Sequence, residues 1–165
     1  MGSEGKWTRV ERRVIYGDTD AMGVMYYGNY MRFLEVGRCE FLRERGRPYA
    51  EIEASGLFMP VAEVGVKYLR PARYDDLVEI AVRVEVLRRA SVRFEYRLSV
   101  LKEEGEPELL ATAFSRHACY SREHERVVSL PPELSAMLAD EPWPLAAEAP
   151  SAEAPAEAPS SETRV

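Results

Sequence analysis

The sequence predicts an α+β domain in which an antiparallel β-sheet packs against one long helix. Apolar residues recur at helical spacing between about residues 29 and 45. Over residues 78–100 they alternate instead with charged and polar residues, which is typical of strands that bury one face. One strand before the helix and four after it complete the pattern, so a helix packed on an antiparallel sheet is the expected architecture.

The chain opens with a charged segment that leads into the first strand. Residues 1–6 contain no apolar run and are expected to be flexible, and one domain is expected over residues 7–140. The first strand should cover residues 8–16. The segment that follows, Tyr-Gly-Asp-Thr-Asp-Ala-Met-Gly-Val-Met-Tyr-Tyr-Gly-Asn-Tyr (residues 16–30), indicates a glycine-punctuated turn before the helix.

The long helix, expected from about residue 29 to 45, should bury one apolar stripe. That stripe consists of Tyr30, Phe33, Leu34, Gly37 and Phe41. Asn29 is an acceptable N-cap, and Gly46 can adopt the left-handed conformation that ends a helix. Because Gly37 costs about 1 kcal/mol of helix propensity relative to Ala, its place in the stripe predicts a close approach to the sheet.

The four later strands are expected as a meander. They should cover about residues 61–70, 78–86, 92–100 and 109–120. Pro71 closes the first of them, and the short connections Arg88–Ala90 and Lys102–Pro107 indicate hairpin turns. A short helix should follow from Pro131-Pro132 through Ala139, since Pro is tolerated in a first helical turn.

The composition limits the class of protein and its partners. With 46% hydrophobic and 30% charged residues, the 165-residue chain fits a single water-soluble domain. A net charge of -6 argues against nucleic acid as the main partner, and no apolar stretch approaches the roughly 18 residues of a membrane-inserted helix. Cys39 and Cys119 have no metal-ligand spacing, so free thiols and a cytoplasmic location are expected.

The C-terminal residues have a different composition from the domain. From Glu141 onward the chain consists mainly of Ala, Glu, Pro and Ser, a mixture that cannot bury a core. Residues 141–165 are therefore expected to be a disordered tail, in which Trp143 is the one residue able to dock.

Asp20 is the leading candidate for a catalytic residue, because it lies in the turn before the expected helix. Backbone N–H groups at a helix N-terminus are unpaired and partly positive, so they can polarise a bound carbonyl while the carboxylate attacks it or activates water. This arrangement favours acyl chemistry. A calcium loop is excluded because Met22 and Asn29 occupy ligand positions of that motif. The alternative for Asp18 and Asp20 is a purely structural Asx turn.

The segment Tyr16–Arg38 resembles a known family. Its core Asp-Thr-Asp-x-x-Gly-Val-x-Tyr-Tyr-x-Asn-Tyr, followed by Phe33-x-Glu35-x-x-Arg38, is similar to the 4-hydroxybenzoyl-CoA thioesterase family of hot-dog folds, and closest to the Tol–Pal-associated acyl-CoA thioesterases. The stretch Arg70–Asp76 is also similar, and the resemblance covers about residues 8–135. It implies a curved antiparallel sheet wrapped around a long central helix, with subunits paired into a homodimer or homotetramer.

The resemblance also implies residue roles. It maps the catalytic carboxylate, as nucleophile or general base, onto Asp20 rather than Asp18, and the oxyanion-stabilising backbone N–H onto Tyr27. Gly28, Tyr30 and Glu35 of the same motif are expected near the substrate. Relatives nearest the Tol–Pal branch commonly carry His in place of Tyr27, but a backbone donor survives that change.

Several of these side chains have a structural alternative. Glu35 supports the site or forms a helix-surface ion pair with Arg38, and Tyr30 lines an acyl pocket or only packs. Arg70, Arg73, Arg88 and Arg89 meet the phosphates of coenzyme A or form an ordinary solvated surface. His117 and His124 are expected in structural or surface roles.

The resemblance implies hydrolysis of an acyl-CoA to a free acid and coenzyme A, with no metal or redox cofactor. An acyl-carrier-protein thioesterase and a non-catalytic acyl-CoA-binding protein are the alternatives. A hydratase is disfavoured, because such sites rely on His and none occurs between residues 1 and 116.

Overall fold

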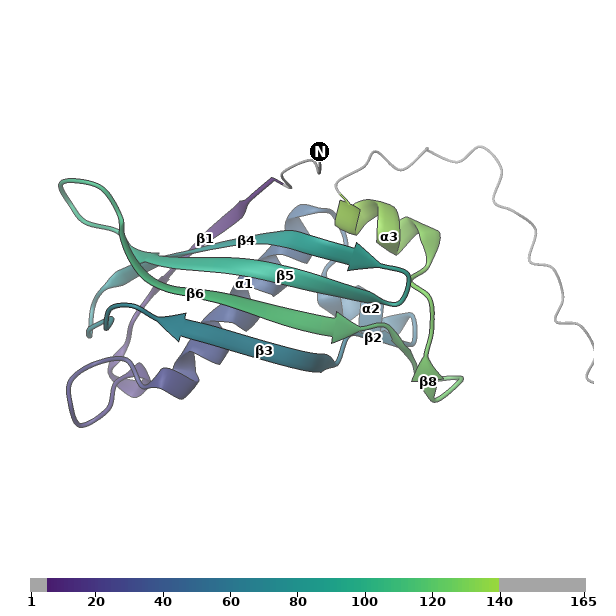
Figure 1. Cartoon of the computed structure of the whole chain (residues 1–165), viewed down its shortest axis with the longest axis horizontal. Coiled ribbons are helices and arrows are strands. Elements are labelled where there is room, and N and C mark those ends of the chain that lie inside the picture. Colours follow the sequence, from purple (N-terminus) through teal and green to yellow (C-terminus); the bar gives the residue numbers. More distant parts are fainter. Residues whose placement is uncertain (1–5, 140–165) are drawn as a thin grey trace, which may run out of the picture.

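The computed structural model describes residues 6–139 and is built on one five-stranded antiparallel sheet (Figure 1). Its strands are ordered β1-β4-β5-β6-β3. They are β1 (Thr8–Arg13), β3 (Val61–Tyr68), β4 (Leu77–Arg88), β5 (Ser91–Val100) and β6 (Glu108–Ala118). Residues 1–5, the predicted tail 141–165 and Trp143 lie outside the described residues.

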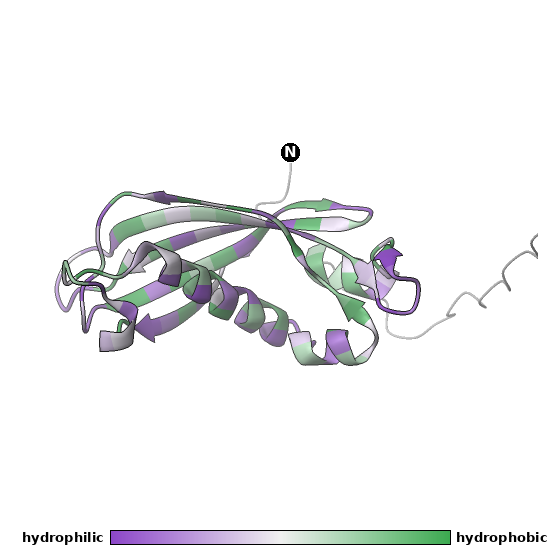
Figure 2. Cartoon of the chain, turned by 90° about the horizontal axis from the view of Figure 1, so that it is seen from below, coloured by the Kyte–Doolittle hydropathy of each residue, from purple (hydrophilic) through white to green (hydrophobic). Residues whose placement is uncertain are grey.

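The long helix α1 (Tyr30–Glu44) lies on one face of the curved sheet, as Figure 2 shows from below. All five residues of the predicted stripe are buried, together with Leu42. A Cβ atom on Gly37 would lie 2.8 Å from Cγ2 of Ile80 in β4, which confirms the predicted close approach. Gly46 has a φ of 82°, so it ends the helix as expected.

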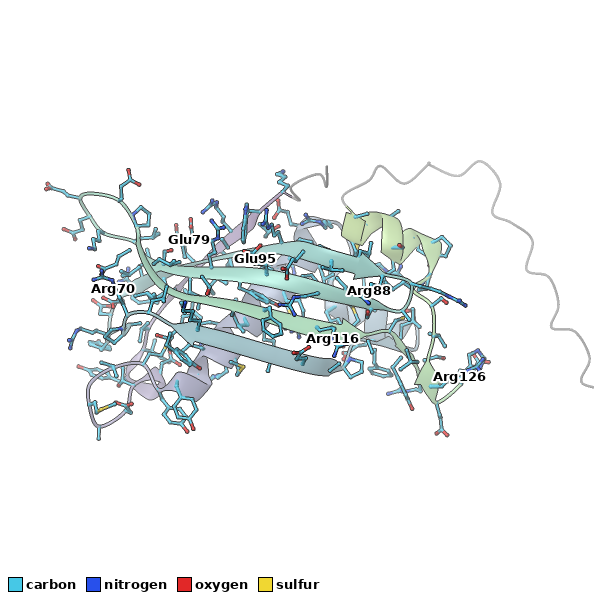
Figure 3. All side chains as sticks on the ribbon, in the orientation of Figure 1. Arg70, Glu79, Arg88, Glu95, Arg116 and Arg126 are labelled. Atoms are coloured by element: carbon cyan, nitrogen blue, oxygen red, sulfur yellow. The ribbon has the colours of Figure 1, made fainter. Side chains whose placement is uncertain are left out.

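The other face of the sheet is charged, which explains the alternation along the strands. Ion pairs connect neighbouring strands there, such as Arg83–Glu95 at 2.7 Å and Arg116–Glu63 at 3.3 Å (Figure 3). Because successive side chains of a strand point to opposite faces, the apolar residues between these charges face α1.

The helical segment starts earlier than the sequence predicts, and Asn29 is not its side-chain cap. A 3-10 turn, η2 (Tyr27–Asn29), runs directly into α1, and Asn29 already has helical angles of -73° and -17°. From that position its side chain instead donates from Nδ2 to the carbonyl of Asp18, at 3.0 Å. The first strand also ends early, at Arg13, and a second 3-10 turn, η1 (Tyr16–Asp18), follows it.

The predicted four-strand meander is wrong in one respect, because β3 lies at the far edge of the sheet beside β6. The chain leaves β3 through residues 69–76, where Pro71 has no N–H to donate and Asp75 has a φ of 71°. This connection pairs with the loop before the helix: Met25 N–H donates to Ala72 O at 2.8 Å. It therefore crosses the end of the sheet to β4 instead of turning back as a hairpin.

Shorter elements lie at the opposite end of the sheet (Figure 1). They are α2 (Tyr49–Ala54), a small sheet of β2 (Leu57–Phe58), β7 (Tyr120–Ser121) and β8 (Arg126–Val127), and α3 (Pro132–Ala139). Only α3 was predicted, and its limits agree with the prediction. Two-residue strands carry no periodic signal, which is why the small sheet has no counterpart in the sequence analysis.

Candidate active site

A cavity of about 310 Å³ lies at the end of the sheet where the 16–30 segment meets β3. Its lining residues come from three segments and are Asp20, Met22, Val24, Met25, Tyr27, Tyr30, Tyr68, Leu69, Arg70 and Pro71. Four of the predicted site residues thus converge: Asp20, Tyr27, Tyr30 and Arg70. A larger hollow of about 740 Å³ at the opposite end is lined by none of these four.

A tight turn holds Asp20 at the cavity. The N–H of Asp20 donates to Val24 O, and the N–H of Gly23 donates to Asp20 O, both at 2.9 Å. Gly23 has a φ of 74°, a conformation that favours glycine. Oδ1 of Asp20 accepts the N–H of Met22 at 2.8 Å, which forms the Asx turn considered as the structural alternative for this residue, while Oδ2 accepts no hydrogen bond from the described residues. The turn therefore orients the carboxylate and leaves one oxygen for a ligand.

Asp18 has a different environment, since it is fully buried. Its Oδ2 accepts the N–H of Ile15 at 3.1 Å, and its Oδ1 lies 3.8 Å from guanidinium nitrogens of both Arg12 and Arg32. Its backbone carbonyl accepts the N–H of Tyr26 at 2.8 Å. Through these contacts Asp18 connects the loop to the start of the helix, and it does not line the cavity.

The start of the helix supplies backbone donors at the cavity. Tyr27 is the first residue of η2, and the first N–H groups of a helix lack intrahelical acceptors and carry partial positive charge. The carbonyls of these first peptides are fixed, because Tyr26 O accepts Asn29 N–H at 2.9 Å and Tyr27 O accepts the Tyr68 hydroxyl at 3.0 Å. A side chain at Gly28 would meet the Tyr26 ring at 2.7 Å.

Two tyrosine rings meet at the cavity. Tyr30 is buried, and its ring packs edge-to-face against Tyr68, with centroids 4.9 Å apart and planes at 82°. Burial raises the pKa of the Tyr30 phenol and that of the Tyr68 phenol above the ordinary value of 10.0, so both remain protonated at neutral pH. The cavity is thus lined by aromatic rings, one carboxylate and the first residue of the helical segment.

Three other predicted residues, Glu35, Arg88 and Arg89, do not line this cavity in one chain. Glu35 is exposed on α1, while Arg38 turns toward His117, with 3.3 Å between Nη1 and Nε2. Arg70 lines the cavity and pairs with Glu108 at 2.7 Å. Arg88 and Arg89 lie at the far end of β4, and Figure 3 shows Arg70 and Arg88 at opposite ends of the sheet.

Arginines gather at that far end. Arg122 and Arg126 line the larger hollow beside β8, and Arg126 also borders a groove with Arg89. Arg89 Nε donates to Ser129 Oγ at 2.8 Å. Within the described part of the chain, Arg88, Arg122 and Arg126 form no ion pair with a carboxylate, unlike most arginines of the sheet.

His117 is buried in a polar network away from the cavity. Its Nδ1 lies 2.9 Å from the carbonyl oxygen of Met59, and its Nε2 lies 2.8 Å from Ser115 Oγ. Ser115 Oγ is in turn 2.8 Å from the Tyr96 hydroxyl. Burial, and then the charge of Arg38, lower the pKa of His117 from 6.5 to about 4. The predicted structural role of His117 is consistent with this setting.

Sequence reasoning missed Tyr68 as a cavity residue. It ends β3, and it meets Tyr27 and Tyr30 only because β3 lies at the sheet edge next to the helix start. No local pattern reports such a contact between residues 41 positions apart. Within residues 6–139 no group of three or more His, Cys, Asp or Glu side chains is arranged to hold a metal ion, and no helix is long and apolar enough to cross a membrane.

Comparison with known proteins identifies the family. The model of the thioesterase-like superfamily matches residues 14–138. The chain belongs to this superfamily. The hot-dog fold and the membership of a thioesterase family, both expected from the 16–38 motif, are therefore confirmed. The association with Tol–Pal stays a prediction.

Members of the superfamily resemble the chain in sequence and in structure. The acyl-CoA thioesterase YbgC of Haemophilus influenzae is 31% identical over 125 residues, which is 75% of this chain and 88% of that protein. The crystal structure of a hypothetical protein from Thermus thermophilus superposes with a TM-score of 0.72 at 36% identity, over 83% of this chain and 98% of that one. A mutant 4-hydroxybenzoyl-CoA thioesterase complexed with 4-hydroxybenzoyl-CoA gives 0.73 at 20% identity, over 80% of this chain and 98% of that one, which is a likeness of fold.

Proposed function

We propose that the chain hydrolyses an acyl-CoA thioester to a free acid and coenzyme A in the cavity lined by Asp20. Membership of the thioesterase-like superfamily supplies the reaction class, thioester hydrolysis, and relatives such as YbgC point to acyl-CoA as the substrate. The observation that supports the site is the cavity itself, which is lined by the start of a helix and by a carboxylate whose Oδ2 accepts no hydrogen bond from the described residues.

The chemistry follows from these two groups. The N–H of Tyr27 donates to the thioester carbonyl and stabilises the negative charge that develops on its oxygen. Asp20 accepts a proton from water as the water oxygen bonds to the carbonyl carbon. The tetrahedral intermediate then expels the thiolate, which takes up that proton. Alternatively Asp20 itself attacks, and water hydrolyses the resulting anhydride. Both routes consume one water and release an acid and a thiol.

The test is free-thiol release from a panel of short, long and aromatic acyl-CoAs by the wild type and by Asp20→Asn. We expect kcat to fall by at least about 100-fold in the variant, because Asn cannot accept the proton or attack. Asp75→Asn is the matched control: Asp75 is exposed, has a φ of 71° that Asn tolerates, and lies outside the cavity. An Asp20→Asn enzyme as active as the control would refute the assignment of Asp20.

We infer further that two chains pair along β3. This strand ends the sheet order, so one of its edges has no partner among the described strands, and Val61 and Val64 on it are 54% and 41% exposed. Such an edge favours pairing with another strand. The antiparallel alignment of two copies would bring the start of one β3 beside Tyr68 of the other.

This pairing offers a role for the distant arginines. It would bring the partner's small sheet toward the Asp20 cavity, because β2 of that sheet directly precedes β3 in each chain. Arg88 and Arg89, with Arg122 and Arg126 near them, would then be available to the phosphates of coenzyme A, for which guanidinium groups are suited. Glu35 and Gly28 remain proposed substrate neighbours on the helix side.

An acyl carrier protein is the second candidate substrate, favoured by Arg88, Arg122 and Arg126, which form no ion pair within the described residues. An acidic partner would be steered by them, and its turnover would fall steeply with added salt. Parallel measurements with acyl-CoA and acyl carrier protein at low and high ionic strength separate the two, since the smaller substrate should show the weaker salt dependence.

A further inference from the structure

We infer that Tyr68 is a positioning residue for the proposed thioester hydrolysis, acting through the peptide that joins Tyr27 to Gly28. The inference rests on the proposed function. It assigns the strand β3 a part in the reaction that its place at the sheet edge alone does not suggest.

The contact that carries the inference is a single hydrogen bond. The hydroxyl of Tyr68 donates to the carbonyl oxygen of Tyr27 at 3.0 Å. The same oxygen accepts the backbone N–H of Tyr30 at the beginning of α1. A carbonyl has two lone pairs, so both donors are accommodated, and the hydroxyl adds a restraint from outside the helix.

This hydrogen bond constrains the Gly28 N–H as well as the Tyr27 carbonyl. The peptide group is planar, so the C=O of Tyr27 and the N–H of Gly28 lie in one rigid unit. Holding the oxygen on one side therefore sets the direction of the N–H on the other. A hydrogen bond to the carbonyl also polarises the peptide, which makes its N–H a stronger donor by about 10–30%. Gly28 directly follows Tyr27, which lines the cavity, so its N–H is assigned to the oxyanion together with that of Tyr27.

The Tyr68 side chain is itself well placed. Its ring packs edge-to-face on buried Tyr30 at 4.9 Å and lines the cavity with Asp20. Burial, followed by the neighbouring Tyr27, raises the pKa of the Tyr68 phenol, so the hydroxyl keeps its proton at neutral pH. The ring is anchored by packing, and the hydroxyl remains a donor at neutral pH.

The experiment compares Tyr68→Phe with Tyr74→Phe. The first variant removes the hydroxyl and keeps the ring. The second removes a hydroxyl from a tyrosine of nearly equal exposure, 46% against 45%, whose ring stacks on Tyr16 outside the cavity. Since a neutral hydrogen bond is worth about 0.5–1.5 kcal/mol, kcat should fall about two- to twelvefold in Tyr68→Phe with KM within about twofold, while Tyr74→Phe matches the wild type.

A second measurement does not depend on turnover. In glycine-labelled protein, the amide resonance of Gly28 should shift in Tyr68→Phe and stay in place in Tyr74→Phe, with the thermal midpoints of both variants close to that of the wild type. A purely structural hydroxyl would lower the midpoint and change kcat and KM together. An acyl-binding hydroxyl would raise KM alone.

The outcomes are distinct. An unmoved Gly28 resonance overturns the inference whatever the activity, and so does a moved resonance with unchanged kcat in an active enzyme. If the wild type hydrolyses none of the acyl-CoA panel, the proposed function fails and with it the role in hydrolysis. The resonance would then still decide whether Tyr68 orients the helix start.

Discussion

Two aspartates separated by one residue have different environments in this protein, and burial accounts for the difference. Asp18 is fully buried between Arg12 and Arg32, where its charge is compensated and its backbone ties the loop to the helix. Asp20 lies on the other side of the turn, where its carboxylate borders a cavity. The Asp-Thr-Asp spacing thus buries the first carboxylate and places the second at the cavity, a rigid arrangement that suits the role proposed for Asp20.

His117 makes the stability of the protein depend on pH. A carbonyl only accepts, so Nδ1 must carry the proton that is donated to Met59 O, and Nε2 is left as the acceptor beside Arg38. Protonation would place a second positive charge at the guanidinium. A folded-state pKa of about 4 against 6.5 means that the unfolded chain binds the proton more readily. The contribution of this residue is therefore complete above pH 6.5 and is lost as the pH falls toward 4.

We accordingly expect the wild type to lose on the order of 3 kcal/mol more unfolding free energy than His117→Gln between pH 7.5 and 4. Urea denaturation across that range provides the measurement. His124→Gln serves as the control, since His124 is exposed and its ring has no hydrogen-bond partner among the described residues. Parallel curves for the wild type and His117→Gln would contradict this account.

Among the elements, the helix was easier to predict than the arrangement of the strands. The stripe of α1 is a local signal with a fixed period, and its buried residues agree with the structure. The place of β3 depends on the 69–76 connection, whose pairing with Met25 joins segments about 47 residues apart and has no periodic signature. For the same reason Asp20, Tyr27 and Tyr30 were found from a continuous motif, whereas Tyr68 was not.

The helix approaches the sheet closely at Gly37, and this contact gives a test of packing. Ala is a better helix former by about 1 kcal/mol, yet its Cβ would lie 2.8 Å from Cγ2 of the fully buried Ile80. We expect Gly37→Ala to destabilise the protein by about 1–3 kcal/mol in chemical denaturation, since overpacking outweighs propensity.

The control for that test removes the methyl group of Ile80 that the added Cβ would contact. Ile80→Ala deletes Cγ2, so in that background Gly37→Ala should be neutral or stabilising, and the two changes should couple strongly in a double-mutant cycle. If Gly37→Ala stabilises the protein that retains Ile80, the helix and sheet have room to separate and the packing argument is wrong.

In the molecule as a whole, the Asp20 cavity and a group of arginines lie at opposite ends of the sheet. The chain carries a net charge of -6, yet Arg88, Arg122 and Arg126 remain without carboxylate partners in the described residues at the end away from Asp20. β4 alone has 12 residues, which corresponds to roughly 40 Å of extended strand between the two ends. The arginines of one chain are therefore too far from its own cavity to contact a thioester bound there, whereas the proposed antiparallel pairing along β3 would bring the partner's arginines toward it.

Val64→Lys tests this arrangement at the exposed edge. A charge on an edge strand opposes strand pairing, so light scattering should show the proposed dimer of the wild type and a monomer in the variant. Val86→Lys, on β4 and 37% exposed, is the control and should remain dimeric.

If the partner's arginines hold the phosphates, KM for acyl-CoA should rise at least about tenfold in the monomer, because several charge-assisted contacts are lost together. KM for a short thioester without phosphates should change little. A Val64→Lys protein that stays dimeric would place the interface elsewhere, and a monomer with unchanged KM would show that each chain binds its substrate alone.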